Sequence, residues 1–434
     1  MPHRICIFRW PLLLAVAAGL SPTAAAQVAD DPPAWVLTSA DSLRNSPLRH
    51  LPASERRDSL GTALKLLELD TAQQHLLTGH LHHHEGRCGG YFAFESLAEA
   101  EDFLARERSL QALLAPAGSD YTIDNAATIE PWFPQVAEAN IRATIEHLSS
   151  YQNRYYTSPH GLDAALWIHD RWAGLAAGRS DVQAELFTAC TLCSTQPSVI
   201  LTVTGTELPD EVVVVGAHLD SIRSGAGSNP EQFAPGADDD ASGIAVITEV
   251  IRIALDSGWR PKRSVKFMGY AAEEIGLRGS RAIAESYAAD GVNVVGVLQL
   301  DMTNYHVGVA YHLHFISDYS NGPLLTFSRE LFDVYLGSRG LQRRDLACGY
   351  GCSDHASWTA KGFPAVMASE PGSPTQSFYP GLHTANDTLG HVGGTAQASV
   401  PFAWFALAFI GELAKTGAES GHPPLHVDGF ESQD

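Results

Sequence analysis

The stretch EVVVVGAHLD at residues 211–220 begins the pattern that decides the fold class. The segment ASGIAVITEVIRIALD at 241–256 follows it, and the apolar run SVKFMGY at 264–270 comes next. Four apolar residues of the middle segment recur at helical spacing and form one stripe: Ile244, Ile247, Ile251 and Leu255. Two short apolar runs joined by an amphipathic helix are typical of a strand–helix–strand unit with parallel strands.

Other short apolar runs predict the remaining strands of the same sheet. They lie at residues 199–205, 293–300, 311–317 and 363–368, and amphipathic helical segments alternate with them. From about residue 190 onward, this alternation predicts an α/β fold, a mostly parallel mixed β-sheet flanked by helices on both faces. The apolar run at 400–411 is too short to span a bilayer, so we interpret it as a buried helix.

Composition limits the classes of partner. The chain has 434 residues, of which 45% are hydrophobic and 18% are charged, and this is enough for one large globular domain with an appendage. Its 28 basic and 49 acidic residues give a formal net charge of −21. Such a charge argues against nucleic acid or an anionic membrane as a partner. We also expect a monomer.

The first 26 residues are typical of a signal peptide. Arg4 and Arg9 precede the apolar run at 11–20, and Ala24 and Ala26 match a small-residue cleavage site. The residue directly after that site is not a cysteine, so a lipid anchor is not expected. We therefore predict a secreted protein, extracellular or periplasmic, that folds in an oxidising compartment.

Residues 27–122 differ from the rest of the chain in their pattern of apolar and polar residues. We treat them as an N-terminal segment that precedes a main domain at 123–417 and a C-terminal tail at 418–434. The segment contains a helix-like polar stretch at 96–114 and no run typical of a buried strand. A polar loop is expected at 79–90. Four histidines of this loop are candidate metal ligands, but without carboxylate or thiolate partners they are more typical of exposed side chains: His80, His82, His83 and His84.

Polar side chains follow the predicted strands at the points where the strands end, or lie in the loop that leads to the next helix. They are acids and one histidine: His218, Asp220, Asp238, Asp239, Asp240, Glu273, Glu274 and Asp301. Active sites of open α/β sheets lie outside the carboxyl ends of the strands, so we expect these side chains to converge. Capping of the following helix by Asp240 or Ser242 explains one or two of the three adjacent aspartates, not all of them.

Such a concentration of carboxylates needs positive charge, because a buried ionised carboxylate without a partner is strongly unfavourable. The lysines and arginines cluster elsewhere, as in RPKR at 260–263, so a metal is the economical source of that charge. Imidazole and carboxylate ligands suit zinc. Two histidines and three carboxylates would hold two ions that share one carboxylate, and the second histidine must come from further along the chain.

Six motifs together resemble those of a known family. They are HLDS (218–221), PGADDDASGIA (235–245), YAAEEIGLRGS (270–280), QLDMTNY (299–305), CGYGCSDHASW (348–358) and LHTANDT (382–388). In their order and spacing, residues 123–417 resemble the secreted bacterial leucyl aminopeptidases, which are di-zinc exopeptidases. The resemblance implies the zinc exopeptidase fold and a zinc-dependent aminopeptidase that acts on peptides with a free N-terminus. The N-terminal segment is loosely similar to the removable prosegment of that family.

Roles for individual residues follow from this resemblance. It implies five ligands for two Zn²⁺ ions: His218, Asp239, Glu274, Asp301 and His383. Asp239 would bridge both ions, and Glu273 would be the general base and then the general acid. Asp220 would orient a ligand imidazole, while Asp238 and Asp240 would serve as hydrogen-bonding or capping groups. By family position, three other histidines are not ligands: His312, His314 and His355.

The resemblance also implies a substrate pocket that favours leucine-like side chains, formed by Met302, Ile316, Tyr350, Met367, Phe378, Tyr379 and Leu382. Ser369 stands where an aromatic residue is expected, and the loop from Glu370 to His383 is about two residues longer than usual, so a wider pocket is an alternative expectation. A disulfide between Cys348 and Cys352 is implied beside the pocket. Two further cysteines, at 190 and 193, either close a small loop or stay reduced, and the one at 88 is left as the odd one.

Other classes of protein fit the same residues less well. A glutaminyl cyclase shares the fold but resembles a one-zinc site without the first histidine, and His218 argues against it. A carboxypeptidase relative would need a basic group for the substrate carboxylate. A non-catalytic binding domain would lack ligands or the base, whereas all six positions are filled here. Ser242 and Ser353 suggest a serine hydrolase only weakly, because the chain has no G-x-S-x-G motif.

Overall fold

The computed structural model describes residues 32–58, 61–85, 89–113 and 121–418, and for residues 107–113 it describes the backbone alone. The predicted signal peptide at 1–26, Cys88 and nearly all of the predicted tail lie outside the described residues. The two sheets of the described chain belong to one compact unit.

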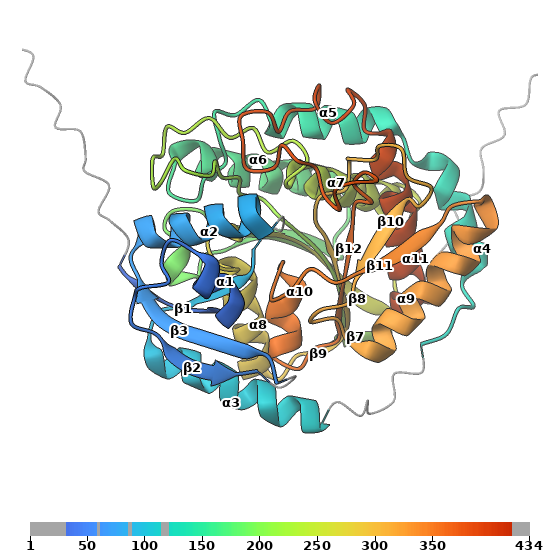
Figure 1. The fold of residues 1–434 in the computed structure, drawn as a ribbon. Coiled ribbons are helices and arrows are strands. Elements are labelled where there is room, and N and C mark those ends of the chain that lie inside the picture. Colours follow the sequence, from blue (N-terminus) through green and yellow to red (C-terminus); the bar gives the residue numbers. More distant parts are fainter. Residues whose placement is uncertain (1–31, 59–60, 86–88, 114–120, 419–434) are drawn as a thin grey trace, which may run out of the picture. The chain divides into compact units, whose positions relative to one another are not determined.

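The main sheet, in the part of the chain that the structure describes, has eight strands in the order β11-β10-β12-β9-β7-β8-β6-β5 (Figure 1). Strand β7 is central and pairs in parallel with β8 and β9, while β12 pairs in parallel with β9. Antiparallel pairs join β6 to β8, β5 to β6 and β10 to β12. The predicted mixed, mostly parallel sheet is therefore confirmed. The strands are β5 (Val182–Phe187), β6 (Ser198–Val203), β7 (Leu208–His218), β8 (Arg263–Tyr270), β9 (Asn293–Leu300), β10 (Leu313–Ile316), β11 (Arg343–Leu346) and β12 (Ala365–Ser369).

Helices cover both faces of this sheet. On one face, α5, α6, α7, α9 and α11 pack over the largest apolar core, which includes Val213 and Val215 of β7. On the other face, α8 and α10 contribute Tyr287 and Trp358, which pack over Val214. The valines of β7 are buried on both sides, which explains its unbroken apolar run. The helices are α4 (Ala126–Ile129), α5 (Glu138–Leu148), α6 (Pro159–Leu175), α7 (Ala241–Asp256), α8 (Arg278–Asp290), α9 (Gly322–Tyr335), α10 (His355–Ala360) and α11 (Val400–Ala414), with short 3₁₀ helices at Glu130–Gln135, Thr191–Cys193, Gly337–Arg339 and Gln397–Ser399.

Helix α11 contains the apolar run predicted to be a buried helix. With the preceding 3₁₀ turn, the helical stretch Gln397–Ala414 has the length and apolar composition of a membrane span, so the run is longer than the sequence indicates. Of its 18 residues, 83% are buried inside the protein. It therefore packs as a core helix within the part of the chain that the structure describes.

The described part of the N-terminal segment forms a second sheet, in the antiparallel order β2-β3-β1-β4. The sequence predicts no buried strand here, and that prediction is wrong: β1 and β4 are almost fully buried. Both strands are short and covered on both sides, so they have no alternating pattern to read. The elements are β1 (Ala34–Ser39), α1 (Ala40–Asn45), β2 (Ser54–Arg57), β3 (Ala63–Leu69), α2 (Thr71–Glu85), β4 (Tyr91–Phe94) and α3 (Leu97–Leu113).

Helix α2 replaces most of the loop predicted at 79–90. Its buried face carries Leu77 and Leu81 together with polar residues such as Gln74 and Thr78, so the apolar stripe is too weak to be recognised in the sequence. The segment packs against the main domain through one apolar cluster that contains Phe92 and Tyr350. Arg278 of α8 donates to Gln74 Oε1 over 2.8 Å, and Ala93 N donates to Gly276 O over 3.2 Å. The division at residue 122 stays a prediction.

Candidate metal centre

The candidate residues meet at the carboxyl ends of three neighbouring strands. His218 is the last residue of β7, Asp301 directly follows β9, and Glu273 and Glu274 lie three and four residues past the end of β8. Asp239 lies just before α7, and His383 comes from the loop after β12. All six side chains are at most 2% exposed. The structure thus brings together every residue that the resemblance assigns to the metals and to the base.

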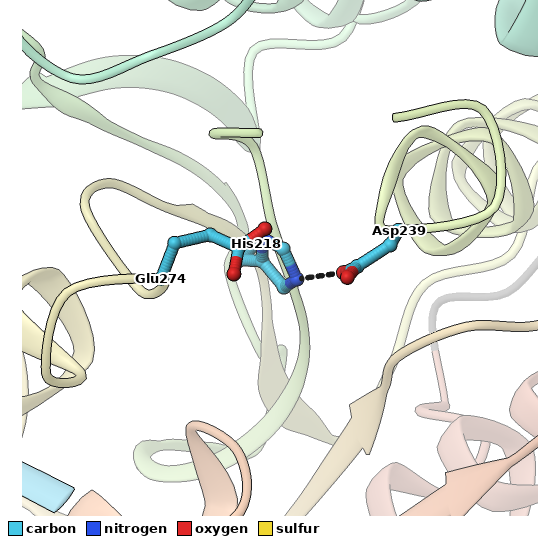
Figure 2. A group of neighbouring side chains, drawn as sticks. All are labelled: His218, Asp239 and Glu274. Atoms are coloured by element: carbon cyan, nitrogen blue, oxygen red, sulfur yellow. Dashed lines mark hydrogen bonds and ion pairs between the residues drawn. The ribbon is translucent and has the colours of Figure 1, made fainter. Parts of the chain in front are cut away.

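Asp239 lies at the centre of this cluster. Its Oδ1 is 2.9 Å from His218 Nε2, a contact drawn as a dashed line in Figure 2, and its Oδ2 is 2.9 Å from His383 Nε2. Glu274 Oε2 is 2.7 Å from the same nitrogen of His383, and Asp301 Oδ1 is 3.6 Å from His218 Nε2. Each oxygen of one carboxylate therefore faces a different histidine, and each histidine has its own second carboxylate.

Charge and burial indicate that cations belong here. Burial raises the pKa of Glu273 well above its usual range, and the carboxylates of Asp354 and Glu274 add to this, while His218 opposes it. Burial also raises the pKa of Glu274 to about 7. Burial alone would lower the pKa of His383, but Glu274 and Asp239 raise it to about 10. The cluster thus attracts positive charge, and its imidazole and carboxylate donors suit zinc.

Glu273 differs from its neighbour Glu274. Both carboxylates are buried and lack well-formed hydrogen bonds, but Glu274 Oε2 is 2.7 Å from His383 Nε2, whereas Glu273 makes no ion pair among the described residues. Donor atoms of His218, Asp239 and Glu274 lie within 4.8 Å of one another, and so do those of His218, Asp240 and Asp301. Glu273 belongs to neither group, so its carboxylate is available for proton transfer.

The three adjacent aspartates have three different tasks. Asp240 caps α7, because its Oδ1 accepts from Gly243 N over 2.9 Å, and its Oδ2 accepts from His218 N over 3.1 Å. Asp238 Oδ1 accepts from Asn304 N over 2.8 Å. Only Asp239 points its carboxylate between the two histidines. The hydrogen-bonding and capping interpretation of Asp238 and Asp240 agrees with these contacts.

Two carboxylates hold the backbone of the site in the same way. Asp220 accepts from the N–H groups of Glu273 and Glu274, at 2.9 and 3.3 Å, and its own carbonyl lies 3.2 Å from His218 Nδ1. Asp387 accepts from Asp238 N over 2.9 Å and from Asp239 N over 3.1 Å. Asp220 therefore fixes the glutamate pair as well as the imidazole. The role of Asp387 was missed, although it lies in the quoted LHTANDT motif.

Arg154 is a second residue that sequence reasoning missed. It is fully buried and donates to Leu219 O, Pro235 O and Gly236 O, at 2.9, 2.6 and 2.8 Å. It is therefore an internal cation beside the aspartates, where the sequence indicates no basic residue. Gly236 has φ +53°, and a Cβ there would lie 2.8 Å from Arg154 Nη2, so this turn needs glycine. No local pattern around residue 154 marks this long-range contact.

Backbone strain is concentrated at the same place. Three non-glycine residues there have positive φ angles: Ala272 (+52°), Met302 (+56°) and His383 (+53°). Each is a candidate ligand or directly adjoins a candidate site residue. Such conformations cost of order 1–3 kcal/mol each and persist only where surrounding contacts hold them, as at functional sites.

The predicted pocket residues fall into three groups. Ile316 pairs with Met367 across β10 and β12, and both lie in the main core with Met302. Tyr350 lies instead in the apolar cluster shared with the N-terminal segment. A cavity of about 310 Å³ is lined by residues 375–380 and 382 and by two histidines of α2, and it includes the remaining three predicted residues, Phe378, Tyr379 and Leu382.

One of those two histidines, His82, corrects the expectation of an exposed, unrelated loop. It is only 9% exposed, and its ring centroid lies 4.4 Å from that of His383. Burial lowers the pKa of His82 to about 2, and His383 contributes to this. His80 is also buried, at 6% exposed, whereas His83 and His84 are exposed, as expected. His82 is thus buried by contact with the main domain, which composition alone could not indicate.

Both cysteine pairs are disulfides. The predicted Cys348–Cys352 bond has an S–S distance of 1.98 Å, and Cys190 is bonded to Cys193 at 1.94 Å. Ser353, which follows the first pair, donates to Asp301 Oδ2 over 2.5 Å, so its hydroxyl supports the cluster and is not a nucleophile of its own. His355 lies 2.9 Å from Asp318 O and takes no part in the cluster.

An open α/β sheet with buried histidines and carboxylates gathered at its carboxyl edge defines a metal-dependent hydrolase. The family model described as "Peptidase family M28" matches residues 198–408. Leucine aminopeptidase 1 of Arthroderma otae is 34% identical over 305 residues, covering 68% of this chain and 79% of that protein. The chain belongs to peptidase family M28.

Two solved structures from Legionella pneumophila are similar as well. The LapA aminopeptidase has a TM-score of 0.73 and 26% identity, and the match covers 88% of this chain and 99% of LapA. LapB has a TM-score of 0.70 and 28% identity, with 88% and 100% covered. Residues 123–417 alone cannot supply 88% of the chain, so both matches extend into the N-terminal segment.

We expect Arg154→Met to lower the free energy of unfolding by about 3–5 kcal/mol, because it leaves buried carbonyls unsatisfied and removes a fixed charge beside the aspartates. Urea unfolding measures the change. The matched control is Arg171→Met on the exposed side of α6, for which we expect a change within about 0.5 kcal/mol. Equal stability of the two variants would contradict the role assigned to Arg154.

Proposed function

We propose that this chain binds two zinc ions and releases leucine-like residues from the N-termini of peptides, in an extracellular or periplasmic compartment. The chain is a zinc-dependent aminopeptidase. Membership of peptidase family M28 and the similarity to leucine aminopeptidase 1 and to LapA support this activity. The observation that carries the proposal of two ions is Asp239, whose two oxygens each face a different histidine.

The distances support one division of the ligands. His218 and Asp301 would hold one ion, His383 and Glu274 would hold the other, and Asp239 would be shared. When bound, zinc would lower the pKa of a water molecule to near neutral pH, and the ion itself would polarise the peptide carbonyl. The hydrogen bonds of Asp220 and Asp387 keep the ligand-bearing backbone in place for this purpose.

Glu273 is the proposed general base. Its unpartnered carboxylate accepts the proton of the attacking water and then delivers it to the nitrogen of the leaving amine. Burial favours the protonated form that this second step needs. The free amino group of the substrate binds at the cluster itself, which explains the restriction to N-terminal residues. The apolar side chains of Met302, Ile316 and Met367 favour leucine-like residues there.

Localisation and assembly are proposed from the disulfides and the net charge. Two disulfides support an oxidising compartment, as expected after removal of residues 1–26. The net charge of −21 supports a protein that acts without nucleic acid or membrane, and we propose a monomer. A cyclase or a non-catalytic domain is disfavoured, because His218 and the five other site residues are all present and close together.

We further propose that residues 27–122 are a removable prosegment that keeps the chain inactive. Helix α2 supports this, because Thr78 Oγ1 donates to Glu274 O over 3.3 Å and the ring of His82 lies on that of His383. Strand β4 supports it too, since Phe92 packs edge-on against Tyr350 with centroids 5.7 Å apart. The segment thus contacts a ligand of the proposed zinc site and a residue of the proposed pocket.

The first prediction separates the two adjacent glutamates. Glu273→Gln should keep two zinc ions and substrate affinity but lower kcat by about 10²–10⁴-fold, because it removes the base without removing a ligand. Glu274→Gln should bind one ion more weakly, and added zinc should partly restore turnover. Zinc content and kcat are measured side by side. If Glu273→Gln lost metal but kept normal turnover per bound zinc, the roles of general base and zinc ligand would have to be exchanged between the two glutamates.

The second prediction concerns the substrate amine. Peptides that begin with Leu, Met or Phe should be shortened from the N-terminus, whereas their acetylated forms should resist, because acetylation removes the amine that binds at the cluster. Mass spectrometry of the products over time gives the result. Cleavage of an acetylated peptide at an internal bond would refute an exopeptidase.

The third prediction tests latency. A specific protease site is placed at the boundary predicted near residue 122, and the zinc-loaded chain is assayed before and after cleavage and removal of the segment. We expect kcat/KM for a leucine anilide to rise at least about tenfold, or ~1.4 kcal/mol. His82→Ala should raise the activity of the uncleaved chain, whereas His50→Ala, at an exposed position of the same segment, should not. Unchanged activity after removal would show that the segment does not inhibit.

A further inference from the structure

A row of side chains crosses the main sheet from the metal cluster to the edge. The register pairs Gly216 with Gln299 and Ala368 with Leu300, so His218, Asp301 and Ser369 continue in line beyond those pairs. Ser369 pairs with His314, which pairs with Arg344 on the edge strand β11. Ser369 Oγ donates to Asp301 O over 2.9 Å, in agreement with this alignment. Neighbouring strands are ~4.8 Å apart, so His314 lies about 10 Å along the row from Asp301.

The neighbouring row on the same face contains the proposed pocket. Met367 and Ile316 pair with each other and lie two residues from Ser369 and His314 on the same strands. Residues two apart on a strand point to the same face, so the pocket wall has an apolar row and a polar row. Ser369 takes the position where the family resemblance leads us to expect an aromatic residue. Its side chain is smaller than an aromatic ring, and it pairs directly with His314 across the two strands.

His314 is unusual among the buried histidines. It is 2% exposed, and neither ring nitrogen makes a well-formed hydrogen bond with the described residues, although the backbone of Glu370 lies beside it. By contrast, His355 Nε2 lies 2.9 Å from Asp318 O, and His75 Nε2 lies 2.7 Å from Tyr155 Oη. Burial, with Arg344 contributing, lowers the pKa of His314 to about 4. The ring is therefore neutral, and apart from the backbone of Glu370 no described residue is placed to bond it, so at least one ring nitrogen is left without a partner.

We propose that His314, with Ser369 beside it, ends the substrate side-chain pocket and lets the enzyme release N-terminal glutamine as well as leucine-like residues. This inference rests on the proposed aminopeptidase function. A carboxamide offers one acceptor and two donors, so it can bond whichever nitrogen of a neutral imidazole is left without a partner. Leucine would fill the apolar row without using that nitrogen. Arg344, next in the row, disfavours a lysine or arginine side chain by repulsion between like charges.

The test compares glutamine, leucine and lysine 4-methylcoumarinyl amides with the zinc-loaded protein, in the form, intact or cleaved, that releases leucine. His314→Val should lower the ratio of kcat/KM for glutamine to that for leucine at least fivefold, mainly through KM, with kcat for leucine within twofold of the parent. His314→Gln should restore part of the ratio, because it keeps hydrogen-bonding groups. The control His312→Val, just before β10 at a partly exposed position, should leave the ratio unchanged.

Each outcome is decisive. If leucine release continues and His314→Val leaves the ratio unchanged, His314 does not contact the substrate and the inference fails while the aminopeptidase function stands. Equal losses for both substrates in His314→Val and His314→Gln, together with lower melting temperatures, would give His314 a structural role only. If the parent protein releases no N-terminal residue in either form, the aminopeptidase function fails, and this inference fails with it.

Discussion

The structure depends on one electrostatic constraint, which is that many carboxylates are buried together at the end of one sheet. Seven of them lie within the cluster or directly around it, each at most 2% exposed: Asp220, Asp238, Asp239, Asp240, Glu273, Glu274 and Asp301. Those that do not face a histidine accept N–H groups of the backbone, with the exception of Glu273. The protein thus separates carboxylates that stabilise its own backbone from carboxylates that are left for a metal and a proton, and this division defines the site.

Most of the main domain could be predicted because its signals are local. Apolar runs mark the strands, the spacing of Ile244 and Ile251 marks α7, and acids at strand ends converge because parallel strands place their carboxyl ends at one edge. Strands β5 and β11 were missed, since both are edge strands without a buried residue: polar residues interrupt the apolar ones in β5 (VQAELF), and β11 (RRDL) has a single apolar residue. Three adjacent aspartates cannot be told apart by composition. Only the family resemblance therefore predicts that Asp239, rather than Asp238 or Asp240, lies between the two histidines.

The features that the sequence does not indicate depend on contacts between residues that are far apart in the sequence. Arg154 binds carbonyl groups of residues 219–236, more than 60 positions away, and nothing in its own neighbourhood marks it as buried. Asp387 fixes backbone groups about 150 positions before it. The strands of the N-terminal segment are buried partly in the segment's own apolar core and partly against the main domain. His82 of α2 is buried against His383, a contact that patterns of local hydropathy could not reveal.

The burial of the cluster is itself partly made by the N-terminal segment. His82 covers His383, and Thr78 satisfies the carbonyl of Glu274, so α2 removes water from two proposed ligands of the same ion. Exclusion of water strengthens the attraction between the carboxylates and any cation they hold. A peptide substrate must take the place of these contacts and exclude water again, because otherwise the attraction between the carboxylates and the cation is weakened. The proposed apolar pocket and the polar row through Ser369 and His314 would therefore do more than select a side chain, because a substrate residue that fills both would close the site again around the reacting bond.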